Sequence, residues 1–307
     1  CVQLSGSFVF LLIPMILDLS KSGRLGISLT KVFMGIGIIA GIVGVGLFAL
    51  SGYYVKERII QRKAVQPVKE LLSGLADNKP LILLLLSNLI LSFAGIGEAF
   101  STYYYFDVLG YASLSIIANT PAFIISLFSY SLIKTDKKRF NNKTIIIGSN
   151  LAVGALQFVL FLVGLHHFQN IKIMLPAIIL CNSITGLFGG ILNTLPVEML
   201  TEAADYAEWK TGVRMEGIAF SLKNSVVKVY GTLAQGLAAL LLSLIGYVSS
   251  EQPIVQNNTV QRRIWIIFSL TPAVIRILCT LPICFYNIVG EKRKQMFNEL
   301  TQLRNKK

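Results

Sequence analysis

The sequence predicts an all-α protein, a polytopic bundle of transmembrane helices. Of its 307 residues, 54% are hydrophobic and only 14% are charged, whereas soluble domains carry about 25% charged residues. Only helical bundles and closed barrels span a membrane, and the apolar runs here are too long for barrel strands. The net charge of +13 then indicates basic loops at the membrane surface and no nucleic-acid partner.

Apolar runs long enough to cross a bilayer follow one another along the chain. A transmembrane helix needs about 20 such residues, and eight runs satisfy this: 1–17, 31–54, 80–106, 111–133, 144–165, 173–195, 217–248 and 263–289. Pro80 and Pro176 are expected at helix starts, where the missing N–H does no harm. Pro121, Pro272 and Pro282 fall inside runs and are expected to kink them.

Basic residues predict the orientation of these helices. Most of the 28 Lys and Arg residues lie in one set of connections, which includes 55–79, 134–143, 210–214 and 290–307. Lys and Arg accumulate on the cytoplasmic side of a membrane. We therefore expect a multi-pass protein of the cell membrane, plasma or inner, with a cytoplasmic C-terminus.

Two of the basic segments also carry apolar residues at helical spacing. These are Val65, Val68, Leu71, Leu72 and Leu75 in the 55–79 segment, and Met296, Phe297, Leu300 and Leu303 in the tail. The pattern predicts two amphipathic surface helices. Each helix could anchor to anionic lipid or act as a cytoplasmic latch.

The cysteines give no sign of a metal site or a disulfide framework. Cys1, Cys181, Cys279 and Cys284 lie in or beside apolar runs without ligand spacing, so we interpret them as small core residues. The chain opens at Cys1 and passes directly into an apolar segment. We interpret this as a fragment that lacks its N-terminal helices.

Lys228 is the most informative intramembrane charge. It lies about 18 Å along a helix counted from Glu216, near the middle of a hydrocarbon core about 30 Å thick. A lysine at that depth costs about 2.5–3.5 kcal/mol and is a functional-site candidate by default. We therefore predict a substrate or coupling site at Lys228, with Lys223 and Asn224 on the same run.

Glu98 is a further candidate for that site. It stands about 25 Å along its run, counted from Leu81, and could make a structural hydrogen bond or contact the substrate. Arg276 is similarly deep, and the sequence assigns it no role.

A charged cluster precedes the run that contains Lys228. Glu202, Asp205 and Glu208 are spaced three residues apart, which predicts one helical face at a cytoplasmic helix end. Acids placed there can pair with bases of neighbouring helices when the inner side is shut and release them when it opens. The candidate gate also includes Lys210, Arg214 and Glu216, and the alternative is a hydrated loop whose charges only set topology.

These residues carry a resemblance to a known family. Residues 205–217, DYAEWKTGVRMEG, followed by Ser221 and Lys228, resemble the signature of the glycoside–pentoside–hexuronide:cation symporters of the major facilitator superfamily. Tyr104-Tyr105-Phe106 with Val108-Leu109-Gly110, and Glu57-Arg58, are similar to the ends of that family's seventh and sixth helices. The resemblance covers essentially the whole chain.

The resemblance implies a major facilitator superfamily fold that lacks its first four helices. Residues 1–54 would be the last two helices of the N-terminal half-bundle, and 55–79 a cytoplasmic middle loop. Residues 80–289 would form the C-terminal six-helix half-bundle, and 290–307 a basic cytoplasmic tail.

The implied function is coupled transport by alternating access. The partners would be a sugar or glycoside, a monovalent cation (sodium or proton) and membrane lipid, with no cofactor beyond the coupling cation and no metal in this fragment. Lys228 resembles the family's lysine close to the sugar and cation sites. Asp205, Glu208, Arg214 and Glu216 resemble its cytoplasmic charged cluster, whereas Lys223 departs from the pattern and leaves the substrate class open.

Two other functions keep the membrane fold. A lysophospholipid:cation symporter of the same superfamily would use the pathway lysines for an anionic head group, and a membrane scaffold would transport nothing. An intramembrane enzyme would need an H-E-x-x-H helix, a G-x-S-x-G turn or paired aspartates for magnesium. The sequence contains none of these, so we expect no enzymatic activity.

Overall fold

Helices are the regular secondary structure of the described residues. The computed structural model describes residues 13–19, 22, 29–54, 78–136, 140–212, 216–248 and 255–305, and no strand occurs among them. The chain divides into two compact units, Cys1–Pro67 and Val68–Lys307.

The first unit contains one long helix. Residues 13–19 are helical, and α2 runs from Leu29 to Tyr54. Its apolar stretch Thr30–Leu50 has no buried residue within the structure. A helix that is apolar on all sides requires lipid or other helices around it, as expected of a membrane span.

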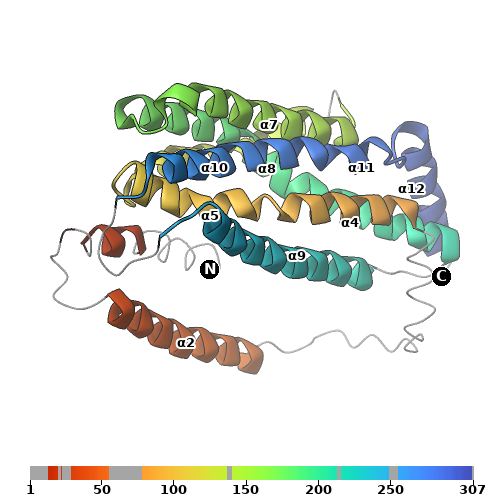
Figure 1. Cartoon of the computed structure of the whole chain (residues 1–307). Coiled ribbons are helices and arrows are strands. Elements are labelled where there is room, and N and C mark those ends of the chain that lie inside the picture. Colours follow the sequence, from red (N-terminus) through yellow and green to blue (C-terminus); the bar gives the residue numbers. More distant parts are fainter. Residues whose placement is uncertain are drawn as a thin grey trace. The chain divides into compact units, whose positions relative to one another are not determined.

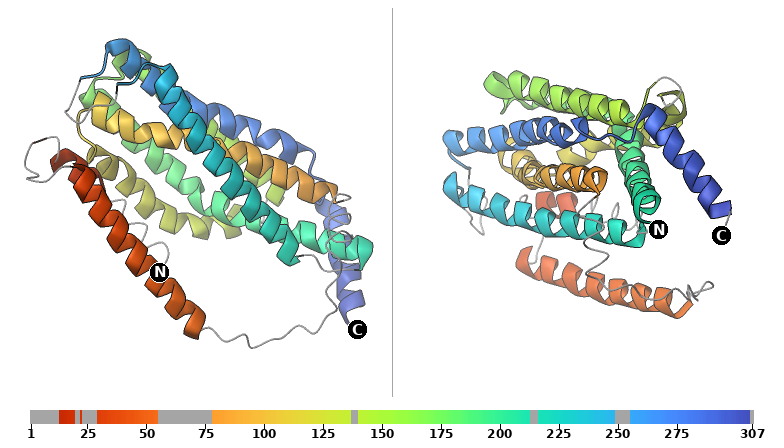
Figure 2. Two further views of the ribbon diagram at one scale, coloured as in Figure 1. Left: turned by 60° about the horizontal axis from the view of Figure 1, so that its bottom comes forward. Right: turned by 90° about the vertical axis from the view of Figure 1, so that its right-hand side faces the viewer.

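The second unit is a bundle of long helices, several of which run side by side in Figure 1. Its elements are α4 (Lys79–Ser92), α5 (Gly95–Tyr103), the π-helix η1 (Tyr104–Val108), α6 (Leu114–Asp136), α7 (Asn142–His167), α8 (Ile171–Thr211), α9 (Glu216–Leu244), α10 (Asn258–Leu278), α11 (Thr280–Cys284) and α12 (Gly290–Asn305). Figures 1 and 2 show α12 at the end of the bundle where α8 ends.

Seven described segments are long and apolar enough to cross a membrane. They correspond to seven of the eight predicted runs, which confirms the all-α polytopic fold. The first predicted run, 1–17, lies mostly outside the described residues, as does most of the 55–79 segment with its predicted surface helix.

Three local predictions need correction. The run 80–106 is not one helix, because α4 ends before Phe93 and Ala94 and the chain continues as α5 and η1. Pro176 is not at a helix start, since α8 begins at Ile171 and contains Pro176 in its interior. The run 173–195 does not end its helix, since the charged residues that follow it are also helical and α8 continues to Thr211. Pro80 does occupy the first turn of α4, as predicted.

Close helix contacts in the bundle depend on glycine. The Gly190 N–H donates to Ser129 Oγ at 2.6 Å, which brings α8 against α6. A Cβ on Gly164 would lie 2.1 Å from the Trp265 ring, so only glycine lets α7 approach α10 there.

Two buried apolar clusters stabilise this packing. One contains Phe100, Tyr104 and Trp265. The other contains Leu195 and Met199 of α8 together with Met296 and Leu300 of α12. The second cluster therefore joins the tail helix to the bundle.

Candidate functional site

The predicted gate acids lie on one face of α8 because this helix continues to Thr211. Glu202, Asp205 and Glu208 are three residues apart and therefore project from the same side. Gly212 ends the helix in the left-handed conformation, with φ 72°, and its N–H donates to the Glu208 carbonyl oxygen at 2.8 Å. The predicted common face at a helix end is confirmed.

Glu202 forms the buried centre of this cluster. The side chain is 3% exposed, and Arg293 of α12 donates to its Oε1 from Nε at 2.9 Å and lies 2.8 Å away through Nη2. The Tyr286 hydroxyl donates to Oε2 at 3.4 Å. A buried carboxylate is costly unless it is paired and hydrogen-bonded, and these donors supply both requirements.

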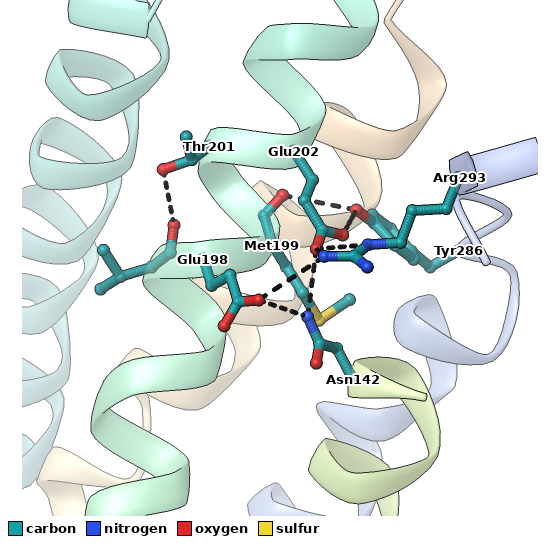
Figure 3. Close-up of polar contacts among 8 residues, drawn as sticks. Asn142, Glu198, Met199, Thr201, Glu202, Tyr286 and Arg293 are labelled. Atoms are coloured by element: carbon teal, nitrogen blue, oxygen red, sulfur yellow. Dashed lines mark hydrogen bonds and ion pairs between the residues drawn. The ribbon is translucent and has the colours of Figure 1, made fainter. Parts of the chain in front are cut away.

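Glu198 and Asn142 extend this centre to α7 (Figure 3). The Asn142 side-chain amide donates to Oε1 of both Glu198 and Glu202 at 3.1 Å, and Arg293 Nη2 lies 3.7 Å from Glu198 Oε1. The cavity that these side chains line measures about 130 Å³. This is well below the roughly 300–1,000 Å³ of small-molecule sites, so the cavity does not fit a sugar.

Arg304 holds the other two acids near the end of α12. Its Nη2 lies 2.7 Å from Asp205 Oδ1 and 2.5 Å from Glu208 Oε2. The Arg304 side chain is 42% exposed and each acid is 14% exposed. Hydrogen bonds to Glu208 and then Asp205 raise the pKa of Arg304 above its ordinary value, so it remains charged.

The apolar side of α12 packs on α8 between the two arginines. Met296 and Leu300 are fully buried, and Trp209 Nε1 donates to Glu299 Oε2 at 2.6 Å. These contacts favour the predicted latch over a lipid anchor for the tail, because the residues expected to face lipid face protein. Leu303 remains exposed.

The other predicted gate residues are Lys210, Arg214 and Glu216. Lys210 lies over the Trp209 ring, 5.1 Å from its centroid, and not beside an acid. Glu216 is the first residue of α9. Arg214 lies outside the described residues.

Three of the four predicted substrate residues, Lys223, Asn224 and Lys228, lie on α9, which has two unlike faces. Ala219, Ala234 and Ala238 are buried, and the α9 ring of Tyr230 lies 6.3 Å from the Phe93 ring. The opposite face carries a polar stripe of exposed residues spaced by three or four, which places them on one side. The stripe consists of Ser221, Asn224, Ser225, Lys228 and Thr232.

The lysines of α9 are not neutralised within the bundle. The ion pairs found among the described residues include neither Lys223 nor Lys228. Lys223 is half-buried and Lys228 is exposed. A lysine at the middle of a membrane requires an acid or a wet cavity.

Glu98 is exposed on α5, and no described contact joins it to Lys228. Arg276 of α10 donates from Nη1 to Asn150 Oδ1 at 3.1 Å. The sequence assigned no role to Arg276, and the structure gives it a partner on α7. No group of three or more His, Cys, Asp or Glu side chains that could hold a metal ion occurs among the residues described.

Five residues of the cluster were absent from the predicted site: Asn142, Glu198, Tyr286, Arg293 and Arg304. A signal existed for the two arginines, because residues 293, 296, 300 and 304 share one helical face of the tail. That spacing places both bases beside the apolar stripe that packs on α8.

Comparison with known proteins identifies the family. A family described as MFS/sugar transport protein matches residues 1–290. The chain belongs to this family. Because the family is one of transporters, the expectation that the chain is not an enzyme is confirmed, and so are the predicted superfamily and the multi-pass membrane character.

The chain is also similar to individual proteins, at low sequence identity. The isoprimeverose transporter of Lactiplantibacillus pentosus is 26% identical over 75% of the chain and 48% of the relative. The glucuronide carrier protein homolog of Escherichia coli K12 is 24% identical over 86% of the chain and 56% of the relative. The uncharacterized symporter YnaJ of Bacillus subtilis is 26% identical over 95% of the chain and 60% of the relative. The chain thus spans about half the length of these relatives.

Proposed function

We propose that this chain acts in a secondary active transporter that couples a sugar or glycoside to sodium or protons by alternating access. The observation that carries the proposal is the polar stripe on α9, with Lys228 exposed in a helix apolar enough to cross a membrane. Two relatives are named for their cargo, an isoprimeverose transporter and a glucuronide carrier protein homolog, and their names support the same class of cargo. A third is named as a symporter, which supports coupling to an ion.

Lys228 is the proposed link between cation and sugar. A lysine and a carboxylate in a low-dielectric site are each costly alone. If a cation bound at an acid that pairs with Lys228, the lysine would reorganise, and the sugar site beside it would change affinity. We place that acid on helices of the full-length protein beyond this chain, with Asn224 and Glu98 as further substrate contacts.

The charged cluster of α8 and α12 is proposed to act on the cytoplasmic side. The predicted orientation puts the ends of both helices there, where ion pairs that form and break can favour one of two bundle shapes. The membrane is proposed to be the plasma or inner membrane.

An anionic cargo is the second candidate. Two positive charges on α9, Lys223 and Lys228, favour a glucuronide over a neutral glycoside, since each positive charge attracts an anion in low dielectric. A lysophospholipid would satisfy the same lysines through its phosphate.

The test is uptake by cells that express the full-length protein containing this chain. The labelled compounds are neutral α- and β-glycosides, pentosides, glucuronides and lysophosphatidylcholine, each with and without a sodium or a proton gradient. Gradient-dependent uptake of a glycoside or glucuronide supports the proposal, and the compound transported fixes the charge class. Uptake of the lipid alone, or uptake indifferent to both gradients, contradicts it.

A further inference from the structure

The two arginines of α12 hold the acids of α8 in physically different ways. Arg293 reaches Glu202, whose side chain is 3% exposed, and Tyr286 and Asn142 contact the same carboxylate. Arg304 reaches Asp205 and Glu208, whose side chains are each 14% exposed. The two arginine side chains are almost equally exposed, at 41% and 42%, so the difference lies in the acids. The predicted gate cluster is therefore not one unit.

Glu202 lacks the properties of an exchangeable gate residue. If Arg293 left, a buried carboxylate would remain beside the carboxylate of Glu198, and burial without a partner disfavours charge strongly. The acid is held from three elements, namely α7, α12 and the segment after α11. Such a centre fixes α12 to the bundle.

Asp205 and Glu208 are less buried than Glu202, and their hydrogen bonds to Arg304 lie at the surface. Exposed ion pairs are weak and exchange easily with other charges or water. Arg304 is the second-last residue of α12, and helix ends open locally at little cost. Met296 and Leu300 are buried and precede this last turn, so opening of the turn leaves their contacts available to keep α12 attached.

We propose that Arg304 is a positioning residue that competes for the gate acids, while Glu202 and Arg293 are a fixed anchor. Arg304 holds Asp205 and Glu208 when the cytoplasmic side is open, and it yields them to bases carried elsewhere in the protein when that side shuts. This deepens the proposed transport function and rests on it. The planar guanidinium suits the role because its Nε and Nη2 donate to the two carboxylate oxygens of Glu208 while Nη2 also reaches Asp205, and the ammonium of lysine reproduces such a two-nitrogen contact poorly.

Competition predicts effects of opposite sign. Arg304→Gln removes the competitor, so the acids pair with the closing bases and the shut state gains population. Asp205→Asn combined with Glu208→Gln removes the gate acids, so the open state gains population. If Arg304 itself held the cytoplasmic side shut, both variants would shift the population toward the open state.

The experiment measures cytoplasmic accessibility in inside-out vesicles that contain the full-length protein. The probe is the labelling rate of Ser221→Cys, at the start of the α9 stripe, by a membrane-impermeant maleimide, corrected for labelling of the same protein without that cysteine. We expect Arg304→Gln to slow labelling about fivefold and the double acid variant to accelerate it. Arg304→Lys should fall between wild type and Arg304→Gln, and Lys294→Gln, which changes an exposed base of the same helix, should match wild type.

Equal signs for Arg304→Gln and the acid variant would overturn the proposal, as would an Arg304→Gln rate equal to wild type. Retention of the wild-type elution profile in detergent excludes misfolding as the cause of a change. Because labelling requires neither substrate nor ion, opposite signs without any measurable uptake would support the competition and contradict the transport function separately.

Discussion

The two charged regions of the second unit differ in whether their charged side chains form ion pairs among the described residues. At the junction of α8 and α12, each acid of the Glu202, Asp205 and Glu208 series lies against an arginine of α12. On α9, Lys228 lies exposed, and the ion pairs of the described residues do not include it. The acids of α8 therefore find their partners within this bundle, whereas the proposed function gives Lys228 a partner from outside it.

This difference also separates stability from transport. Substitutions in the paired cluster remove contacts that hold α12 to the bundle, so they should change the free energy of unfolding. Substitutions in the polar stripe remove no described ion pair, so they should change transport and leave unfolding nearly unaltered.

Lys228→Ala should have the largest effect. Loss of a charge partner inside a low-dielectric site costs about 3 kcal/mol, which corresponds to an initial uptake rate about a hundredfold lower. Thermal unfolding in detergent should stay near wild type. The matched control is Lys172→Ala at the exposed start of α8, and equal uptake by the two variants would remove Lys228 from the pathway.

Arg293→Leu should have the largest effect on stability. It leaves Glu202 buried without its cation, which costs about 3 kcal/mol, measured as the free energy of unfolding in detergent. Lys294→Leu is the control, because its pair with Glu291 is 72% and 90% exposed and such pairs contribute about 1 kcal/mol or less. Similar losses in the two variants would contradict a buried centre at Glu202.

Arg304→Leu should destabilise the protein by less than about 1 kcal/mol, because its ion pairs are partly solvated. The loss should vanish near 1 M salt, where the screening length falls to about 3 Å. Unfolding of Arg304→Leu and Arg293→Leu at low and high salt measures this contrast. A salt-resistant loss in Arg304→Leu would mean that the two arginine contacts are alike.

Trp209→Phe should have the smallest effect on stability, and the effect should be measurable only at acidic pH. The Trp209 N–H, and then Gln295, lower the pKa of Glu299. A lowered folded pKa stabilises the folded state above the pKa of the unfolded chain, about 4.3, and this stabilisation is lost as the pH falls through the folded pKa. The variant should therefore lose less stability than wild type between about pH 5 and pH 3.

Melting temperatures across that pH range measure this difference. Trp265→Phe is the control, since Trp265 Nε1 has no hydrogen-bond partner among the described residues, and it should leave the acid slope unchanged. An acid slope of Trp209→Phe equal to that of wild type would show that the Glu299 contact does not form in solution.

The sequence predicts the membrane helices well because hydrophobic length is a local property. Seven of the predicted runs coincide with apolar helices of the structure. The common face of Glu202, Asp205 and Glu208 also follows from local spacing, as does the position of Lys228 within an apolar run.

Contacts between distant residues were not predictable in the same way. Arg293 pairs with an acid 91 residues away, and Arg276 with an amide 126 residues away; both pairs depend on tertiary packing that spacing does not encode. The interruption at Phe93 and Ala94, and the interior position of Pro176, were missed because hydropathy is insensitive to backbone breaks and helix starts.

The central claim is secondary active transport, and accumulation in proteoliposomes tests it most directly. The purified full-length protein is reconstituted, an inward sodium or proton gradient is imposed, and the internal concentration of the labelled glycoside identified in cells is followed. The account predicts accumulation above the external concentration, collapse when an ionophore dissipates the gradient, and no accumulation by Lys228→Ala. Simple equilibration of the glycoside in wild type, with or without the gradient, would contradict it.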